Sequence, residues 1–295
     1  MEHSKPHFLQ SLTLLFPLFA MLATLPCACG TQAMAAVSQQ EKDALTALYN
    51  GTNGSSWTEN ANWNNGDPCE NNWHGITCNS SNSSVVQINL PSNNLSGYIP
   101  TELGNLANLQ YLYLQNNQLS GAIPTTIGNM NSLRTLDLSH NQLSGAIPAT
   151  AGNLNSLAWL YLQDNQLSGD IPGTLGNLSN LQYMYLYDNR LSGPIPETIG
   201  NLSSLTILYL YNNQLCGAIP ETLTNLTTLF NDYGMKLDNN NLDTDVSPAL
   251  DTFIQQKSGG DTWKSTQGHV ETCGSQNFPW PIFLPAVTGR FMESP

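Results

Sequence analysis

The chain has 295 residues, of which 21 are acidic and only 8 are lysine or arginine, so its formal net charge is −13 at pH 7. This negative charge argues against nucleic acid or an anionic lipid surface as a general partner, because both carry phosphate. By length alone one or two domains would be expected, but internal repetition makes length a poor guide to domain number here.

Residues 1–35 are typical of a secretory signal peptide. A lone Lys5 precedes an apolar run from Phe8 to Leu25, and the small residues Ala33-Met34-Ala35 follow, where we expect cleavage after Ala35. The alternatives are a lipoprotein signal at Cys27 or Cys29 and an uncleaved anchor. We expect a secreted protein, extracellular or at the cell surface, whose mature chain has no transmembrane helix.

Residues 36–84 are predicted to form an N-terminal cap. The run Ser38-Gln39-Gln40-Glu41 matches a helix capping box and leads into a short helix with Ala44, Leu45 and Leu48 on one side. Such a helix can cover the open end of a repeat stack, which would otherwise expose core and sheet edge.

From residue 85 to residue 246 one pattern recurs about seven times, every 24 residues. Its form is LxxLxLxxNxLSGxIPxxLGxL, and six copies begin at Val85, Leu109, Leu133, Leu157, Leu181 and Leu205. A fixed period of this length predicts a solenoid, in which each coil buries its apolar side against its neighbours.

Each part of the repeat has a physical reason. Leu112 and Leu114 show the period of two of a short strand buried on one side, and stacked copies give a parallel sheet. Asn117 and its counterparts are expected to satisfy backbone groups where the strand turns away. Gly121 permits a bend and Pro124 resists helix formation, so the convex side should be irregular or 3-10.

The repeat resembles the plant-type subclass of extracellular leucine-rich repeats, known from receptor-kinase ectodomains and polygalacturonase-inhibiting proteins; bacterial secreted proteins carry such repeats too. The segment with Trp63, Asp67-Pro68-Cys69 and Trp73–Cys78 resembles the amino-terminal cap of that family. The resemblance covers residues 38–257 and supports a disulfide between Cys69 and Cys78. It implies an α/β-type solenoid, a right-handed superhelix with a parallel concave sheet and an irregular or 3-10 convex side, capped by short helices.

Side chains that alternate with the buried strand positions should face the concave side. Many are aromatic, and since coils are about 4.8 Å apart we expect one continuous aromatic strip. The candidate ligand-binding residues on this face are Tyr111, Tyr113, Trp159, Tyr161, Asp164, Tyr183, Tyr185, Tyr187, Asp188, Tyr209 and Tyr211. For the rings, the alternative to binding is mutual packing that stabilises the sheet, and for the two aspartates it is solvated surface charge.

The C-terminal part should close the other end of the stack. Ser247-Pro248 is predicted to start a capping helix over residues 247–260 that carries Leu250, Phe253 and Ile254. Residues 261–295 are expected to form an irregular tail that covers the last coil. Cys216 and Cys273 either form a disulfide or remain free thiols.

No catalytic motif, cofactor site or metal site is evident in the sequence, so we do not expect an enzyme. His140 beside Asp164 lacks a nucleophile and a pocket. The leading hypothesis is a recognition module that binds an extracellular protein or peptide on its concave face, with a neutral glycan as a near variant. The negative charge of the chain favours a basic partner. The alternatives are an adhesin or coat protein that uses the solenoid as a spacer, and an inhibitor of an extracellular hydrolase.

Overall fold

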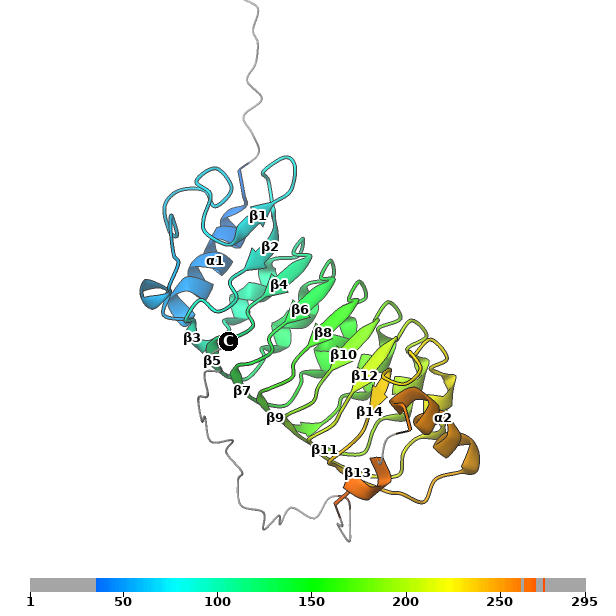
Figure 1. Cartoon of the computed structure of the whole chain (residues 1–295). Helices are drawn as coiled ribbons and strands as arrows, with labels where there is room; N and C mark the ends of the chain where they lie inside the picture. The colour runs from blue at the N-terminus through cyan, green and yellow to red at the C-terminus, as the bar shows by residue number, and fades with distance from the viewer. Residues whose placement is uncertain (1–35, 261–262, 269–272, 274–295) are drawn as a thin grey trace, which may run out of the picture. The chain divides into compact units, whose positions relative to one another are not determined.

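The computed structural model describes residues 36–260, 263–268 and 273. The predicted signal peptide and most of the predicted tail lie outside the described residues. Stacked coils fill most of the described part, and each coil adds one strand to each of two sheets (Figure 1).

The N-terminal end is covered by helix α1 (Gln39–Gly51), which packs across the first coil (Figure 1). Its predicted cap is present, because the hydroxyl of Ser38 accepts a hydrogen bond from the backbone N–H of Glu41 over 3.2 Å. The short helix η1 (Gly54–Ser56) follows, and strand β1 (Ile76–Cys78) pairs with β2 (Val85–Asn89) in the antiparallel sense. A disulfide joins Cys69 to Cys78, with the two Cα atoms 5.8 Å apart.

The first sheet runs along one side of the stack in the order β1-β2-β4-β6-β8-β10-β12-β14. From β2 onward all neighbours are parallel, and between β2 and β12 each residue pairs with the one 24 positions later. The strands beyond β2 are β4 (Tyr111–Tyr113), β6 (Thr135–Asp137), β8 (Trp159–Tyr161), β10 (Tyr183–Tyr185), β12 (Ile207–Tyr209) and β14 (Met235–Lys236). This is the predicted concave sheet.

A second parallel sheet, which the sequence did not predict, follows the first turn of every coil. Its seven strands run in the order β15-β13-β11-β9-β7-β5-β3. They are β3 (Ser96–Tyr98), β5 (Gln118–Gly121), β7 (Gln142–Gly145), β9 (Gln166–Asp170), β11 (Arg190–Gly193), β13 (Gln214–Gly217) and β15 (Asn241–Leu242). The expectation of a wholly irregular or 3-10 region here was therefore incomplete.

The rest of each coil contains the predicted 3-10 turns, which stack from coil to coil. They are η2 (Thr101–Asn105), η3 (Thr125–Asn129), η4 (Ala149–Asn153), η5 (Gly173–Asn177), η6 (Glu197–Asn201) and η7 (Glu221–Asn225). A proline in extended conformation precedes each turn, which fits its fixed φ and its missing N–H.

Buried leucines and isoleucines fill the interior of every coil, and an asparagine ladder closes the turn between the two sheets. The side-chain oxygen of Asn165 accepts from the backbone N–H of Leu143 over 2.9 Å, and its nitrogen donates to the carbonyls of Leu138 (3.0 Å) and Leu162 (3.1 Å). Asn117, Asn141, Asn189, Asn213 and Asn240 make the same kind of bridge. The predicted role of this asparagine is confirmed.

At the C-terminal end the last coil bulges at residues 230–234 before β14, and helix α2 (Pro248–Ser258) covers it. Ser247 caps α2 by accepting from the N–H of Leu250 over 3.2 Å, as predicted. The ammonium group of buried Lys257 donates to the carbonyl of Leu229 over 2.8 Å. The short turn η8 (Trp263–Thr266) follows, and Cys273 forms a disulfide with Cys216 of β13.

Candidate functional site

The concave face of the first sheet presents three columns of side chains. The first two are set by alternate strand residues, such as Tyr183 and Tyr185 in β10. The backbone ladder continues past the strands, since the N–H of His140 bonds to the carbonyl of Gln163 over 3.0 Å. A third column therefore lies two residues beyond the second, and it contains Gln115, Ser139, Gln163, Tyr187 and Tyr211.

Six tyrosine rings from three neighbouring coils touch one another on this face. We call them the tyrosine cluster: Tyr161, Tyr183, Tyr185, Tyr187, Tyr209 and Tyr211. Tyr185 and Tyr209 stack with ring centroids 4.9 Å apart, and Tyr187 and Tyr211 stack at 4.4 Å. Each ring is half-buried by its neighbours, so the cluster presents a preformed aromatic surface.

The aromatic strip is interrupted, so the prediction of one continuous strip is wrong. Tyr111 and Tyr113 stack on each other at 6.3 Å, but strand β6 separates them from the tyrosine cluster. This strand places Thr135 and Asp137 in the two columns where its neighbours carry rings. Trp159 lies in the first column beside Thr135, and no ring contact joins it to the other aromatic residues described. The rings thus form a pair and a cluster of six.

Five hydroxyl groups of the cluster have a raised pKa and are neutral at ordinary pH. Burial raises the pKa of Tyr161 and of Tyr185 to about 12, and it also raises the pKa of Tyr187, Tyr209 and Tyr211. The cluster therefore offers uncharged rings with polar tips, a combination that suits protein contact surfaces.

Asp164 and Asp188 lie beside the tyrosine cluster, but the backbone gives them a structural reason to be there. Their φ angles are 55° and 52°, in the left-handed region that Asn and Asp enter more readily than other non-glycine residues. The same turn position is left-handed in other coils, at Ser92, Asn116, His140, Asn212 and Asn239. Asp164 pairs with His140 over 3.2 Å, and Asp188 accepts from Asn212 over 2.6 Å.

Asp137 was not among the predicted site residues. It lies in the second column, in register with Tyr113 on one side and Tyr161 on the other. The hydroxyl and the backbone N–H of Ser139 both donate to its Oδ1 atom, over 2.6 and 3.1 Å, and burial raises its pKa. The signal that could have identified it was the loss of both aromatic residues from one coil of an otherwise tyrosine-rich column.

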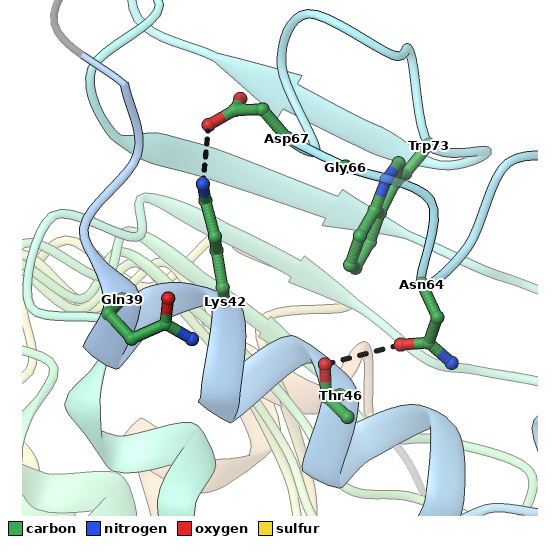
Figure 2. Close-up of a pocket in the computed structure, with 7 residues that line it drawn as sticks. All are labelled: Gln39, Lys42, Thr46, Asn64, Gly66, Asp67 and Trp73. Carbon is green, nitrogen blue, oxygen red and sulfur yellow. Dashed lines mark hydrogen bonds and ion pairs between the residues drawn. The ribbon is translucent and has the colours of Figure 1, made fainter.

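A pocket lies at the N-terminal cap, away from the concave face. Gln39, Lys42, Thr46, Asn64, Gly66, Asp67 and Trp73 line it (Figure 2). Lys42 pairs with Asp67 over 3.0 Å, and Thr46 donates to Asn64 over 3.2 Å. Asp67 also accepts from the backbone N–H groups of Val37 and Cys69. Because its polar groups pair with one another, this pocket is explained by the packing of α1 against the cap.

The described residues hold no group of three or more histidine, cysteine, aspartate or glutamate side chains placed to bind a metal ion. Within the same residues, no helix has the length and apolar character needed to cross a membrane. The concave face therefore remains the candidate site.

Three segments of the chain match known family descriptions. Residues 38–79 match "Leucine rich repeat N-terminal domain", residues 84–191 match "Leucine-rich repeat region", and residues 204–226 match "Leucine Rich Repeat". Over 72 residues the chain is 46% identical to a probable leucine-rich repeat receptor-like protein kinase of Arabidopsis thaliana. That match covers 24% of this chain and 7% of the kinase, so the chain spans less than a tenth of its curated relative.

Solved receptor structures are similar to this chain. PEPR1, in a structure with AtPEP1, is 36% identical with a TM-score of 0.65, and the match covers 72% of this chain and 30% of that chain. Pollen Receptor Kinase 3 is 33% identical with a TM-score of 0.58, covering 69% and 96% respectively. The plant peptide hormone receptor RGFR1, in complex with RGF2, is 36% identical with a TM-score of 0.54, covering 58% and 30%.

Proposed function

Because the chain belongs to the leucine-rich repeat proteins, we propose that it is a recognition module that binds an extended peptide, or an extended segment of a protein, along its concave face. The tyrosine cluster is the central anchor of this site and the pair Tyr111–Tyr113 is a second contact. The module acts by binding and not by catalysis, and it works outside the cell or at the cell surface.

The observation that carries the proposal is the tyrosine cluster itself. Rings that already contact their neighbours lose little conformational freedom when a partner covers them, so more of the contact energy appears as affinity. Tyrosine is also favoured among residues that dominate binding energy at interfaces. The parallel sheet holds the rings in fixed columns, which suits a partner that runs across several coils.

Two further features support a peptide partner and an extracellular location. The structures of PEPR1 with AtPEP1 and of the peptide hormone receptor RGFR1 with RGF2 are solved examples of similar coils with a bound partner. The two disulfides, Cys69–Cys78 and Cys216–Cys273, fit an oxidising compartment.

The test is a selection of peptides from a random twelve-residue library on the immobilised protein, followed by affinity measurements with variants. We expect the double variant Tyr185→Ala/Tyr209→Ala to weaken binding of the selected peptides by about tenfold or more, since each ring is an interfacial anchor. The matched control is Tyr98→Ala, which removes a tyrosine that is 61% exposed in β3 of the second sheet.

Undiminished binding by the double variant, with its thermal unfolding unchanged, would place the site elsewhere. Concentration-dependent self-assembly of the purified chain that the double variant abolishes would instead favour the adhesin or coat-protein alternative.

A further inference from the structure

The break in the tyrosine columns at β6 is a distinct place on the concave face. Asp137 occupies the second column there, and the rings of Tyr113 and Tyr161 occupy the same column in the two neighbouring strands. Those two ring positions are two strand spacings apart, or about 9.5 Å. A planar group that enters between them therefore has a ring on each side and a carboxylate beneath it.

Within the described residues, the carboxylate of Asp137 forms no ion pair. The ion pairs among the described residues join Lys42 to Asp67, His140 to Asp164 and Lys264 to Asp251, and none includes Asp137. Ser139 donates only to the Oδ1 atom, which leaves Oδ2 without a hydrogen-bond donor in the described part of the chain. His140 acts on Asp137 electrostatically, but its ring nitrogen contacts Asp164.

Other acceptors near Asp137 also lack donors. The side-chain oxygens of Gln115, Thr135 and Gln163 are buried and have no hydrogen-bond partner among the residues that the structure describes. Thr135 lies on the same strand as Asp137, and Gln115 and Gln163 lie in the third column of the two neighbouring coils. Unpaired buried polar atoms of this kind are uncommon in folded proteins. This part of the face therefore has a surplus of acceptors.

We propose that the break at β6 is a subsite for the guanidinium group of an arginine side chain in the bound peptide, with Asp137 as its charge partner and Tyr113 and Tyr161 as the rings that flank it. This inference rests on the proposed peptide-binding function and specifies one residue of the ligand.

A guanidinium fits the site better than an ammonium group. It is planar and stacks on aromatic faces, and it has five N–H donors in a fixed fork with no acceptor. The site supplies two rings and a carboxylate oxygen with an open acceptor position. A lysine ammonium is a compact, strongly hydrated charge that would use the flanking rings less well.

The test measures binding of three small probes to the intact chain by ligand-observed NMR: N-acetyl-arginine amide, N-acetyl-lysine amide and N-acetyl-citrulline amide. Citrulline has nearly the shape of arginine but no charge. We expect the dissociation constant for the arginine probe to be about tenfold lower than for the citrulline probe, as for a charge-assisted pair. We expect Asp137→Asn, which keeps the acceptor for Ser139, to abolish that preference.

The matched control is Asp170→Asn, which removes the same charge from an exposed position in β9 of the second sheet and should leave the preference intact. The proposal would be overturned by any of three results. These are equal binding of the arginine and citrulline probes, a preference for arginine that survives Asp137→Asn, and binding of the lysine probe as tight as that of the arginine probe. The variant Tyr185→Ala/Tyr209→Ala should keep the arginine preference, because it leaves Tyr113, Asp137 and Tyr161 in place. A failure of this subsite is thereby distinguished from a failure of the proposed function.

Discussion

Two kinds of aspartate lie on the concave face, and they differ in what holds them there. Asp164 and Asp188 occupy a turn position with positive φ, where a short polar side chain relieves backbone strain, and each has a side-chain partner in an adjacent coil. Asp137 lies in a strand, where any residue fits, and Ser139 is its only donor in the described part of the chain. A residue that the fold does not require is the better candidate for a functional role.

Asp137→Asn should stabilise the fold at neutral pH. Burial raises the pKa of Asp137 in the folded state above its unfolded value, so the ionised carboxylate costs stability above the unfolded pKa, and that cost is relieved as the pH falls through the folded pKa. Thermal unfolding should give a higher Tm for the variant at about pH 7, with the difference vanishing toward about pH 3. Asp170→Asn controls for the change in net charge, and an equal gain in that variant would contradict the assignment.

Strands with a strong hydrophobic period could be predicted from the sequence, whereas strands without such a period could not. The pair Leu112 and Leu114 predicted the first sheet. Strand β5 of the second sheet buries only Leu119 among its four residues, and its polar neighbours read equally well as a loop. That sheet forms because stacked coils bring their backbones into register, so that Gly121, for example, pairs with Leu143 of the next coil. Its strands therefore result from stacking and not from a local preference of their residues for strand.

The glycine near the end of the turns η2 to η6 should be intolerant of a side chain. A Cβ atom on Gly152 would collide with the backbone carbonyl and side chain of Thr174 in the next coil. We expect Gly152→Ala to lower the free energy of unfolding by about 1–3 kcal/mol, because the stacked turns must separate. Urea denaturation followed by circular dichroism measures the change.

Gly173 provides the matched control for that prediction. It begins turn η5, and a Cβ atom there would come no closer than 3.4 Å to Thr198. Gly173→Ala should therefore be neutral or slightly stabilising, since alanine restricts the unfolded chain more than glycine does. Equal losses in the two variants would show that contact between turns is not the cause.

At the scale of the described molecule, the 24-residue period carried most of the prediction. It gave the stack and the asparagine ladder, because those features depend on which residues recur, whereas the two capping helices were predicted from their own start signals at Ser38 and Ser247. It could not predict that the break at β6 is a candidate binding site. That role of Asp137 depends on the aromatic residues that lie in register with it in the two neighbouring strands. It also left Cys216 and Cys273 undecided, because their pairing depends on where the chain returns after α2.

A stack of this kind should lose stability from an end inward, because each coil contacts only its neighbours. The disulfide Cys69–Cys78 closes a short loop, with a sequence separation of 9, at the end of strand β1, which pairs with β2. Removing it in Cys69→Ser/Cys78→Ser should lower the free energy of unfolding by roughly 2–3 kcal/mol through the regained loop entropy.

Hydrogen exchange in this variant should quicken in Val85–Asn89 and remain unchanged in Ile207–Tyr209, five coils away. The variant Cys216→Ser/Cys273→Ser is the control at the other end, and it should leave exchange in Val85–Asn89 unaltered. If exchange instead rose equally in both strands of the first variant, the coils would unfold as one cooperative unit. The cap would then determine the stability of the coils that carry the tyrosine cluster as well as that of the first coil.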